Sequence, residues 1–226
     1  GALAPPGRGC PARTGLRVQS GVHDEFLSRL VQRARGMKLG DGRKQGTDVG
    51  PLINEASLRK VEQYVDVGVS EGADLLCGGR RSSSGDLKNG YFFEPTVFAR
   101  VEQGMRVEQE EIFGPVLSVV RFRTADEAFA VNNGVKYGLS SSVYTSDVGI
   151  AFRALNELDN GITYINAPTI GAEAHLPFGG VKQTGNGHRE GGWEGYEFYS
   201  ETKAGYVDFS GQLQRAQIDN YLGTPD

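Results

Sequence analysis

Apolar residues recur at helical spacing in four stretches of the chain. From Asp24 onward, an apolar stripe at i, i+3, i+4 and i+7 predicts a helix, and acidic residues at its start favour it through the helix dipole. Asn54 is expected to cap a second helix. Thr124 and Glu127 have capping-box spacing for a third helix, and Asp147 is expected to cap a fourth. The apolar residues expected in these helices are, in turn, Leu27, Leu30, Val31 and Ala34; Leu58, Val61, Val65 and Val69; Ala128, Phe129 and Val131; and Val148, Phe152 and Leu155.

Short apolar runs between these helices predict β-strands. The run 117–122 is interpreted as a buried strand. Pro95 lacks an N–H for a strand ladder, so the run 91–98 can join a central strand only after this proline. The other predicted strands are 16–19, 73–77, 141–145 and 162–165. Because strands alternate with helices of about ten to fifteen residues, the sequence predicts one α/β domain with a mostly parallel sheet.

Composition narrows the classes of function. The 226 residues include 24 Lys and Arg against 28 Asp and Glu, and this net charge of −4 argues against binding nucleic acid through phosphate contacts. Mean hydropathy is −0.38, and no run approaches the roughly 18 apolar residues of a membrane span. Two cysteines, Cys10 and Cys77, cannot form a disulfide framework, so we expect a reducing, cytoplasmic compartment. The 33 glycines are about twice the average usage and predict many tight turns.

Residue types and spacing alone indicate few candidate catalytic or metal-binding residues. The histidines, His23, His175 and His188, lack metal-ligand spacing, so no metal site is predicted. Cys77 ends an apolar strand and is interpreted as a packed small hydrophobe. Cys10 lies in a glycine-rich segment beside two arginines, a setting in which a thiol can become a reactive thiolate. A terminal surface cysteine is the simpler interpretation, and the residues alone leave both roles open.

Four short motifs resemble landmarks of the aldehyde dehydrogenase superfamily, and they stand in that family's order. They are 50–53 (GPLI), 110–116 (EEIFGPV), 161–166 (GITYIN) and 177–185 (PFGGVKQTG). The resemblance extends over roughly 18–211, nearly the whole chain, and four ordered motifs are far more specific than one. It implies the family's catalytic domain, a mostly parallel, Rossmann-like sheet with flanking helices.

The resemblance nominates Cys10 as a catalytic nucleophile. In the family the cysteine sits in a G-Q-x-C motif at a fixed distance before a helix containing D-E-F, and here 7–10 precedes 24–26 at that distance. Arg8 replaces the usual glutamine and Pro11 follows the cysteine, so this segment departs from the family pattern. In such enzymes the thiolate attacks an aldehyde carbonyl, hydride leaves to the nicotinamide ring, and the resulting thioester is hydrolysed.

The resemblance also implies a site for NAD or NADP. Glu111 matches the carboxylate that binds the nicotinamide ribose hydroxyls, Phe113 matches the aromatic residue at the nicotinamide end, and Lys60 matches a position contacting the cofactor ribose. The alternatives are a solvated acid beside a turn for Glu111 and a solvated helix lysine for Lys60. Phe178, in the loop that lines the aldehyde entrance in the family, is expected to contact substrate or else to be ordinary core.

The resemblance finally implies how the chain is divided. Residues 1–15 are expected to be a poorly ordered remnant that carries the nucleophile candidate, and 16–200 the catalytic domain. Residues 201–211 are expected to form an oligomerisation strand that pairs with a neighbouring subunit, centred on 203–209, followed by a polar tail over 212–226. The family's cofactor domain, with its general-base glutamate and oxyanion-hole asparagine, is not in these residues, so we expect a truncated enzyme that is inactive alone. The alternative is a non-catalytic interaction or structural protein that keeps the fold.

Overall fold

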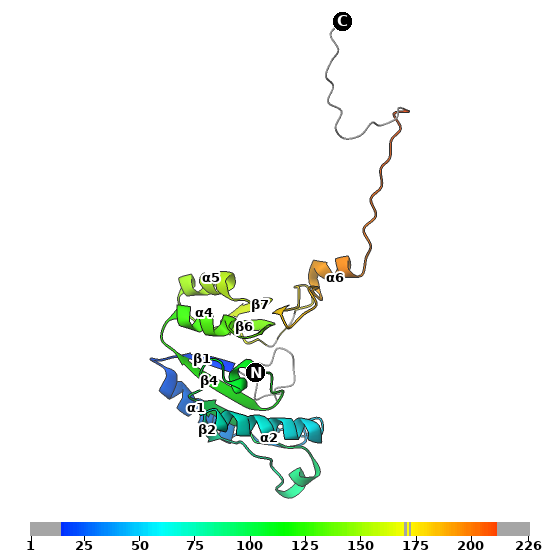
Figure 1. The fold of residues 1–226 in the computed structure, drawn as a ribbon. Coiled ribbons are helices and arrows are strands. Elements are labelled where there is room, and N and C mark those ends of the chain that lie inside the picture. The colour runs from blue at the N-terminus through cyan, green and yellow to red at the C-terminus, as the bar shows by residue number, and fades with distance from the viewer. Residues whose placement is uncertain (1–14, 170, 172, 212–226) are drawn as a thin grey trace.

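The computed structural model describes residues 15–169, 171 and 173–211, and within them strands and helices are interspersed along the chain (Figure 1). The strands are β1 (Gly15–Gln19), β2 (Asp74–Cys77), β3 (Thr96–Ala99), β4 (Val116–Phe122), β5 (Tyr137–Gly138), β6 (Ser140–Val143), β7 (Ile162–Ile165) and β8 (Val181–Lys182). The helices are α1 (His23–Arg35), α2 (Glu55–Ser70), α3 (Arg106–Gln109), α4 (Ala125–Asn133), α5 (Val148–Glu157) and α6 (Gly192–Phe198), with a 3-10 turn over Gly85–Asn89.

The described strands form one four-stranded sheet and two strand pairs. The larger sheet has the order β1-β4-β3-β2, in which β4 runs parallel to β1 and β3, and β2 is an antiparallel edge. β6 and β7 form a parallel pair, and β5 and β8 a short antiparallel pair. Parallel pairing predominates, which confirms the predicted α/β class, although the described strands are divided among separate sheets.

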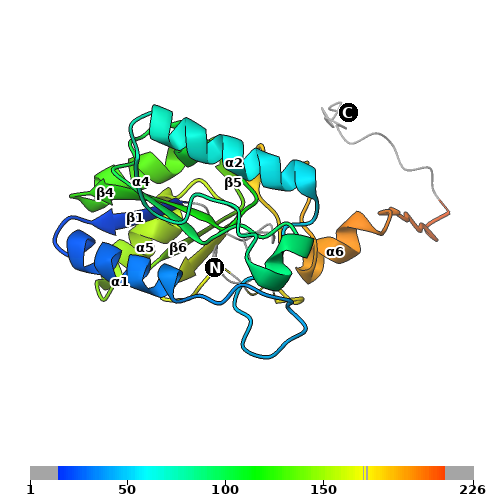
Figure 2. The same ribbon diagram turned by 90° about the horizontal axis from the view of Figure 1, so that it is seen from below.

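Both faces of the larger sheet are covered by helices. Successive residues of a strand point to opposite faces, so Val97 and Val119 pack with the apolar face of α1, while Phe98 and Val120 pack with that of α2. Figure 2 shows α1 and α2 on opposite sides of β1 and β4. Burial on both faces explains why β4 reads as a continuous apolar run in the sequence.

The predicted helix starts are confirmed by side-chain caps. In three helices the capping oxygen accepts the N–H of the residue three positions on, at 2.8, 3.2 and 3.1 Å, and the caps are Asn54, Thr124 and Asp147. The strand expected beyond Pro95 begins at Thr96, as predicted, and occupies a central place in the sheet.

The apolar stripe that predicts α5 does not face the core. Val148, Phe152 and Leu155 are 69%, 62% and 50% exposed. The buried residues of this region are Ala154 and Leu158, which pack with α4. The spacing identified the helix, but the α5 side chains that pack against this cluster are Ala154 and Ile150.

The segment 201–209 belongs to no strand of the described chain. All of its residues are exposed, and Tyr206 and Phe209 are each 95% exposed. The sequence predicts that this segment pairs with a neighbouring subunit. A single chain does not test that pairing, so the oligomerisation strand stays a prediction. No helix in the described part of the chain has both the length and the apolar character needed to cross a membrane.

Candidate functional site

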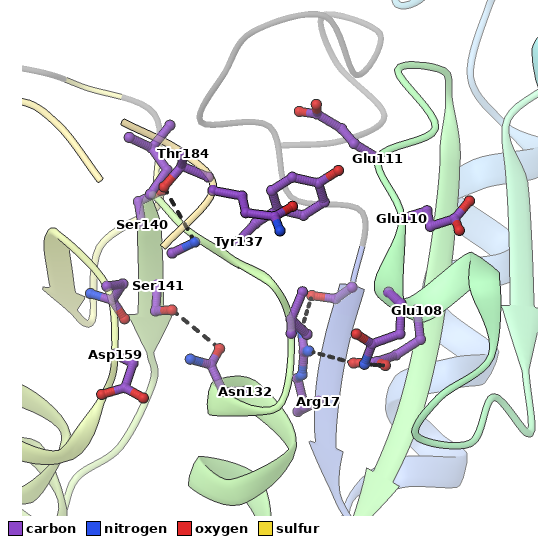
Figure 3. A pocket seen from close by; sticks show the side chains of 17 residues that line it. Arg17, Glu108, Glu110, Glu111, Asn132, Tyr137, Ser140, Ser141, Asp159 and Thr184 are labelled. Carbon is purple, nitrogen blue, oxygen red and sulfur yellow. Dashed lines mark hydrogen bonds and ion pairs between the residues drawn. The ribbon is translucent and has the colours of Figure 1, made fainter. Parts of the chain in front are cut away.

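A pocket of about 280 Å³ lies between β1 and β6 (Figure 3). Its walls come from the start of β1, from α3 and the loop after it, from α4 through β6, and from short segments at 159–160 and 183–184. Most of the lining residues are polar, and Val135, Tyr137 and Leu139 add apolar surface. Glu111, predicted to bind the cofactor, is one of the lining residues.

The loop after α3 presents Glu111 and Phe113 at the surface. Ile112, between them, is fully buried, and both neighbours are exposed. Phe113 has a φ of +58°, a left-handed conformation that turns the chain sharply after the buried residue. Gly114 lies so close to α2 that a Cβ would stand 2.5 Å from Cγ2 of the buried, β-branched Val61. Glycine at this position therefore lets the loop lie directly against α2.

Side chains of α2 hold this loop in place. Lys60 Nζ donates to the Glu111 carbonyl oxygen at 2.8 Å and lies 5.6 Å from the centre of the Tyr64 ring. The Tyr64 hydroxyl donates to the Glu110 carboxylate at 2.6 Å, and Arg106 pairs with the same carboxylate at 3.0 Å. The structure thus brings two of the predicted cofactor residues, Lys60 and Glu111, into direct contact.

The two acids of the loop have opposite pKa shifts. Hydrogen bonds from Arg106 and then from Tyr64 lower the pKa of Glu110. Partial loss of hydration raises the pKa of Glu111, and the positive charge of Lys60 opposes this rise. Among the described residues, no donor bonds the Glu111 carboxylate, so both of its oxygens have acceptor capacity left. Neighbouring side chains thus hold the Glu110 carboxylate, whereas no described residue bonds the Glu111 carboxylate.

A buried ion pair lies in the wall of the pocket. Arg17 Nη2 donates to Glu108 Oε1 at 2.9 Å, and the two side chains are 11% and 0% exposed. Gln109 donates to the second Glu108 oxygen at 2.6 Å. Burial lowers the pKa of Arg17, and Glu108 opposes this effect. The pair joins β1 to α3 across 91 residues, and no local sequence pattern marks it.

Phe178 and Cys77, which the sequence also singled out, do not line this pocket. Phe178 is half-buried and exchanges two backbone hydrogen bonds with Glu190, at 2.6 and 2.8 Å, and it is not among the lining residues. Cys77 is partly buried in the core under α1, and burial raises the pKa of its thiol, which confirms the packed role. Cys10 lies outside the described residues.

The α/β fold, with an exposed glutamate and phenylalanine on the loop after α3, is that of an aldehyde dehydrogenase catalytic domain. A model of the aldehyde dehydrogenase family matches residues 1–204. The chain therefore belongs to this family, as its motifs predicted.

Individual relatives agree with this assignment. Betaine aldehyde dehydrogenase of Bacillus subtilis is 42% identical over 202 residues, which are 88% of this chain and 40% of the relative. Alpha-ketoglutaric semialdehyde dehydrogenase of the same organism is 36% identical over 207 residues, 92% of this chain and 42% of the relative. This chain thus spans about two fifths of the length of the curated relatives it matches.

Solved structures show the same similarity. A crystal structure of Staphylococcus aureus betaine aldehyde dehydrogenase in complex with NAD+ superimposes with a TM-score of 0.82 at 41% identity, over 85% of this chain and 38% of that one. An NAD-dependent aldehyde dehydrogenase from Sinorhizobium meliloti gives a TM-score of 0.88 at 37% identity, over 95% and 41%.

Proposed function

We propose that this chain supplies the catalytic part of an enzyme that oxidises a small-molecule aldehyde to a carboxylic acid with NAD or NADP. The observation that carries the proposal is the loop 110–114, which α2 holds in place. It presents a carboxylate that no described residue bonds, together with an aromatic ring, beside the pocket in a chain of this family. The NAD+ complex of the S. aureus relative supports the choice of cofactor.

The residues on this loop fit a nicotinamide nucleotide. A ribose diol offers two hydroxyl donors, and the Glu111 carboxylate offers two acceptor oxygens. Phe113 is 37% exposed and gives a flat ring an apolar surface to pack against. The ammonium group of Lys60 has three donors, of which the Glu111 carbonyl takes one, so it has donors left for a ribose oxygen. When bound, the nucleotide accepts the hydride removed from the aldehyde carbon.

Cys10 is the nucleophile in this proposal. Its thiolate forms a C–S bond with the aldehyde carbon, and loss of hydride from that carbon leaves a thioester. Water then attacks the thioester carbonyl, the C–S bond breaks, and the carboxylic acid leaves as the thiolate is restored. Phe178, near the glycine motif 177–185, is proposed to contact the aldehyde.

The proposed organisation assigns residues 1–15 to the nucleophile segment and 16–200 to the catalytic domain. The exposed aromatic residues of the extended segment 201–211 support pairing with another copy of the chain. The low cysteine content favours a cytoplasmic setting.

The test joins this chain to the part of B. subtilis betaine aldehyde dehydrogenase that lies outside the matched 40% and measures NADH formation from betaine aldehyde. The joined protein is expected to form NADH, and the unjoined 226-residue chain to form none. Cys10→Ala is expected to abolish both turnover and the covalent thioester, while Cys77→Ala keeps them. An unchanged rate in Cys10→Ala contradicts the assignment of the nucleophile.

A further inference from the structure

Four Asn-Gly dipeptides occur in the sequence, and the structure places them in different surroundings. They are 89–90, 133–134, 160–161 and 186–187. Asparagine is a chemically labile residue, because the backbone nitrogen of the next residue can attack its side-chain amide. A following glycine favours this attack, since it has no Cβ to crowd the approach. The attack also needs a glycine N–H and an asparagine amide that are not held by hydrogen bonds, so the fold decides which of the four dipeptides can react.

The dipeptide 133–134, at the end of α4, is held on both sides. Asn133 Nδ2 donates to the Glu157 carbonyl oxygen at 2.6 Å, and its Oδ1 accepts the Asp159 N–H at 2.9 Å. The Gly134 N–H donates to the Ala130 carbonyl oxygen at 2.9 Å, as the last bond of the helix. Both the amide and the attacking nitrogen are therefore engaged.

The dipeptide 160–161, before β7, is held in the same way. Asn160 Nδ2 donates to the Ile162 carbonyl oxygen and to Thr163 Oγ1, each at 2.8 Å. The Gly161 N–H donates to the Gly138 carbonyl oxygen at 3.0 Å. Reaction at this dipeptide requires that these bonds break first.

The dipeptide 89–90 is protected on its glycine side. The Asn89 side chain is exposed at the end of the 3-10 turn, but the Gly90 N–H donates to the Leu87 carbonyl oxygen at 3.2 Å. Gly90 also lies against an aromatic ring, because a Cβ built there would stand 2.6 Å from Cε2 of Phe92. We expect slow reaction here, with fewer bonds to break than at Asn133 or Asn160.

The dipeptide 186–187 has none of these restraints. Both residues are exposed, and they lie between β8 and α6 outside any helix or strand. Among the described residues, neither the Gly187 N–H nor Asn186 Nδ2 has a hydrogen-bond partner, and a Cβ built at Gly187 would meet nothing within 4 Å. Asn186 Oδ1 accepts the His188 N–H at 3.2 Å. This bond holds the amide against the backbone that follows it and makes the amide carbon more electrophilic, while Nδ2 stays free to leave.

We propose that Asn186 is a site of spontaneous deamidation in the folded chain. The Gly187 backbone nitrogen forms a bond with Cγ of Asn186, the Cγ–Nδ2 bond breaks, and ammonia leaves with the proton that the backbone nitrogen gives up. Water then opens the resulting succinimide at either of its carbonyls and leaves aspartate or isoaspartate. The reaction consumes water alone and needs no oxidant or reductant. This inference rests on the contacts of the four dipeptides and does not depend on the proposed function.

The modified residue lies in a loop whose ends are joined. Phe178 and Glu190 exchange two backbone hydrogen bonds, at 2.6 and 2.8 Å, and inside the loop Arg189 Nη1 donates to the Gly180 carbonyl oxygen at 3.0 Å. Aspartate adds a negative charge to this loop, and isoaspartate also adds one methylene group to its backbone. Deamidation therefore changes the charge, and in the isoaspartate form the length, of the loop that carries most of the motif 177–185.

The test incubates the folded 226-residue chain at neutral pH and follows the four asparagines by peptide mass spectrometry, which separates aspartate and isoaspartate from asparagine. Asn186 is expected to convert about tenfold faster or more than Asn133 and Asn160, because several hydrogen bonds must break before either of those can react. Asn89 is expected to lie between these rates. In urea, where the fold no longer protects any of them, the four are expected to convert at similar rates.

Two glutamine variants at exposed positions form a matched pair. Glutamine keeps a side-chain amide, but its extra methylene group requires a larger ring and makes the attack much slower. Asn186→Gln is expected to remove most of the ammonia that the folded chain releases, and Asn89→Gln to remove little of it. Circular dichroism checks that both variants fold.

Three results would each overturn the proposal. The first is a rate at any of the other three dipeptides that equals or exceeds the rate at Asn186 in the folded chain. The second is unchanged ammonia release from Asn186→Gln. The third is a lead of Asn186 that persists undiminished in urea, because the fold would then not select the site.

Discussion

Residues 15–122 and residues 125–198 follow the same α/β plan, but they bury their apolar side chains to different extents. In the first region, α1 and α2 cover both faces of one sheet, and Phe93, Phe98 and Val116 are among many fully buried side chains. In the second region, β6 and β7 pack with α4 and α5 around a small cluster centred on Phe129 and Ala154. The aromatic residues of α6 are exposed instead.

The two regions therefore differ in how far contacts within the described chain stabilise them. The first region completes its own core and carries the loop with Glu111, so its geometry is fixed by contacts inside the chain. The second region leaves a strand edge at β6 and apolar surface on α5 and α6 without cover from the described residues. We expect contacts with further polypeptide to stabilise the second region more than the first.

The largest expected effect is on the free energy of unfolding. It is seen by replacing one phenylalanine in each region. Phe98→Ala removes a fully buried ring and is expected to lower the free energy of unfolding by about 3–5 kcal/mol. Phe152→Ala, at an exposed site on α5, is expected to change it by less than about 0.5 kcal/mol. Urea denaturation followed by circular dichroism measures both. Similar losses for the two variants would contradict the difference between the regions.

A second prediction concerns the buried ion pair between β1 and α3. Arg17→Met alone leaves the Glu108 carboxylate buried without its cation and is expected to cost about 3 kcal/mol or more. The double change to methionine is expected to restore most of this loss, because no buried charge is then unpaired. A double-mutant cycle in urea measures the coupling, and simple additivity of the two losses would show that the pair is not coupled.

The smallest expected effect is a pH dependence at Glu110. Its pKa is lowered in the folded chain by Arg106 and Tyr64, so its contribution to stability is present above the unfolded pKa and is lost as pH falls through the folded value. Glu110→Gln is therefore expected to make the unfolding midpoint less sensitive to acid below about pH 4.5. Thermal melts between neutral and acid pH measure this, with Glu62→Gln on α2 as the comparison. An unaltered acid sensitivity would show that Glu110 contributes no such stability.

Local chemistry made much of the fold predictable. Asn54 and Asp147 cap the helices that they were expected to cap. The strand β4 could be predicted from its apolar run, because both of its faces are buried. The four motifs identified the family. The contact between Lys60 and the Glu111 carbonyl could not be predicted, because it depends on how α2 lies against the loop.

Features that depend on contacts between residues far apart in the chain could not be predicted from the sequence. Arg17 and Glu108 meet across 91 residues, and neither stands in a pattern that marks it as buried. The exposed stripe on α5 was misleading for a related reason. Periodicity identifies an apolar face, but packing decides whether that face is covered.

The most direct test of the central claim is the Michaelis constant for NAD+ in the joined protein with Glu111→Gln. The account predicts that this constant rises about tenfold or more, because the amide offers one acceptor oxygen where the carboxylate offers two charged ones. Glu110→Gln is the matched control, since that carboxylate is already paired with Arg106 and Tyr64, and it is expected to keep the constant of the parent. An unchanged constant in Glu111→Gln, or an equal rise in both variants, would contradict the claim that this loop holds the nucleotide through Glu111.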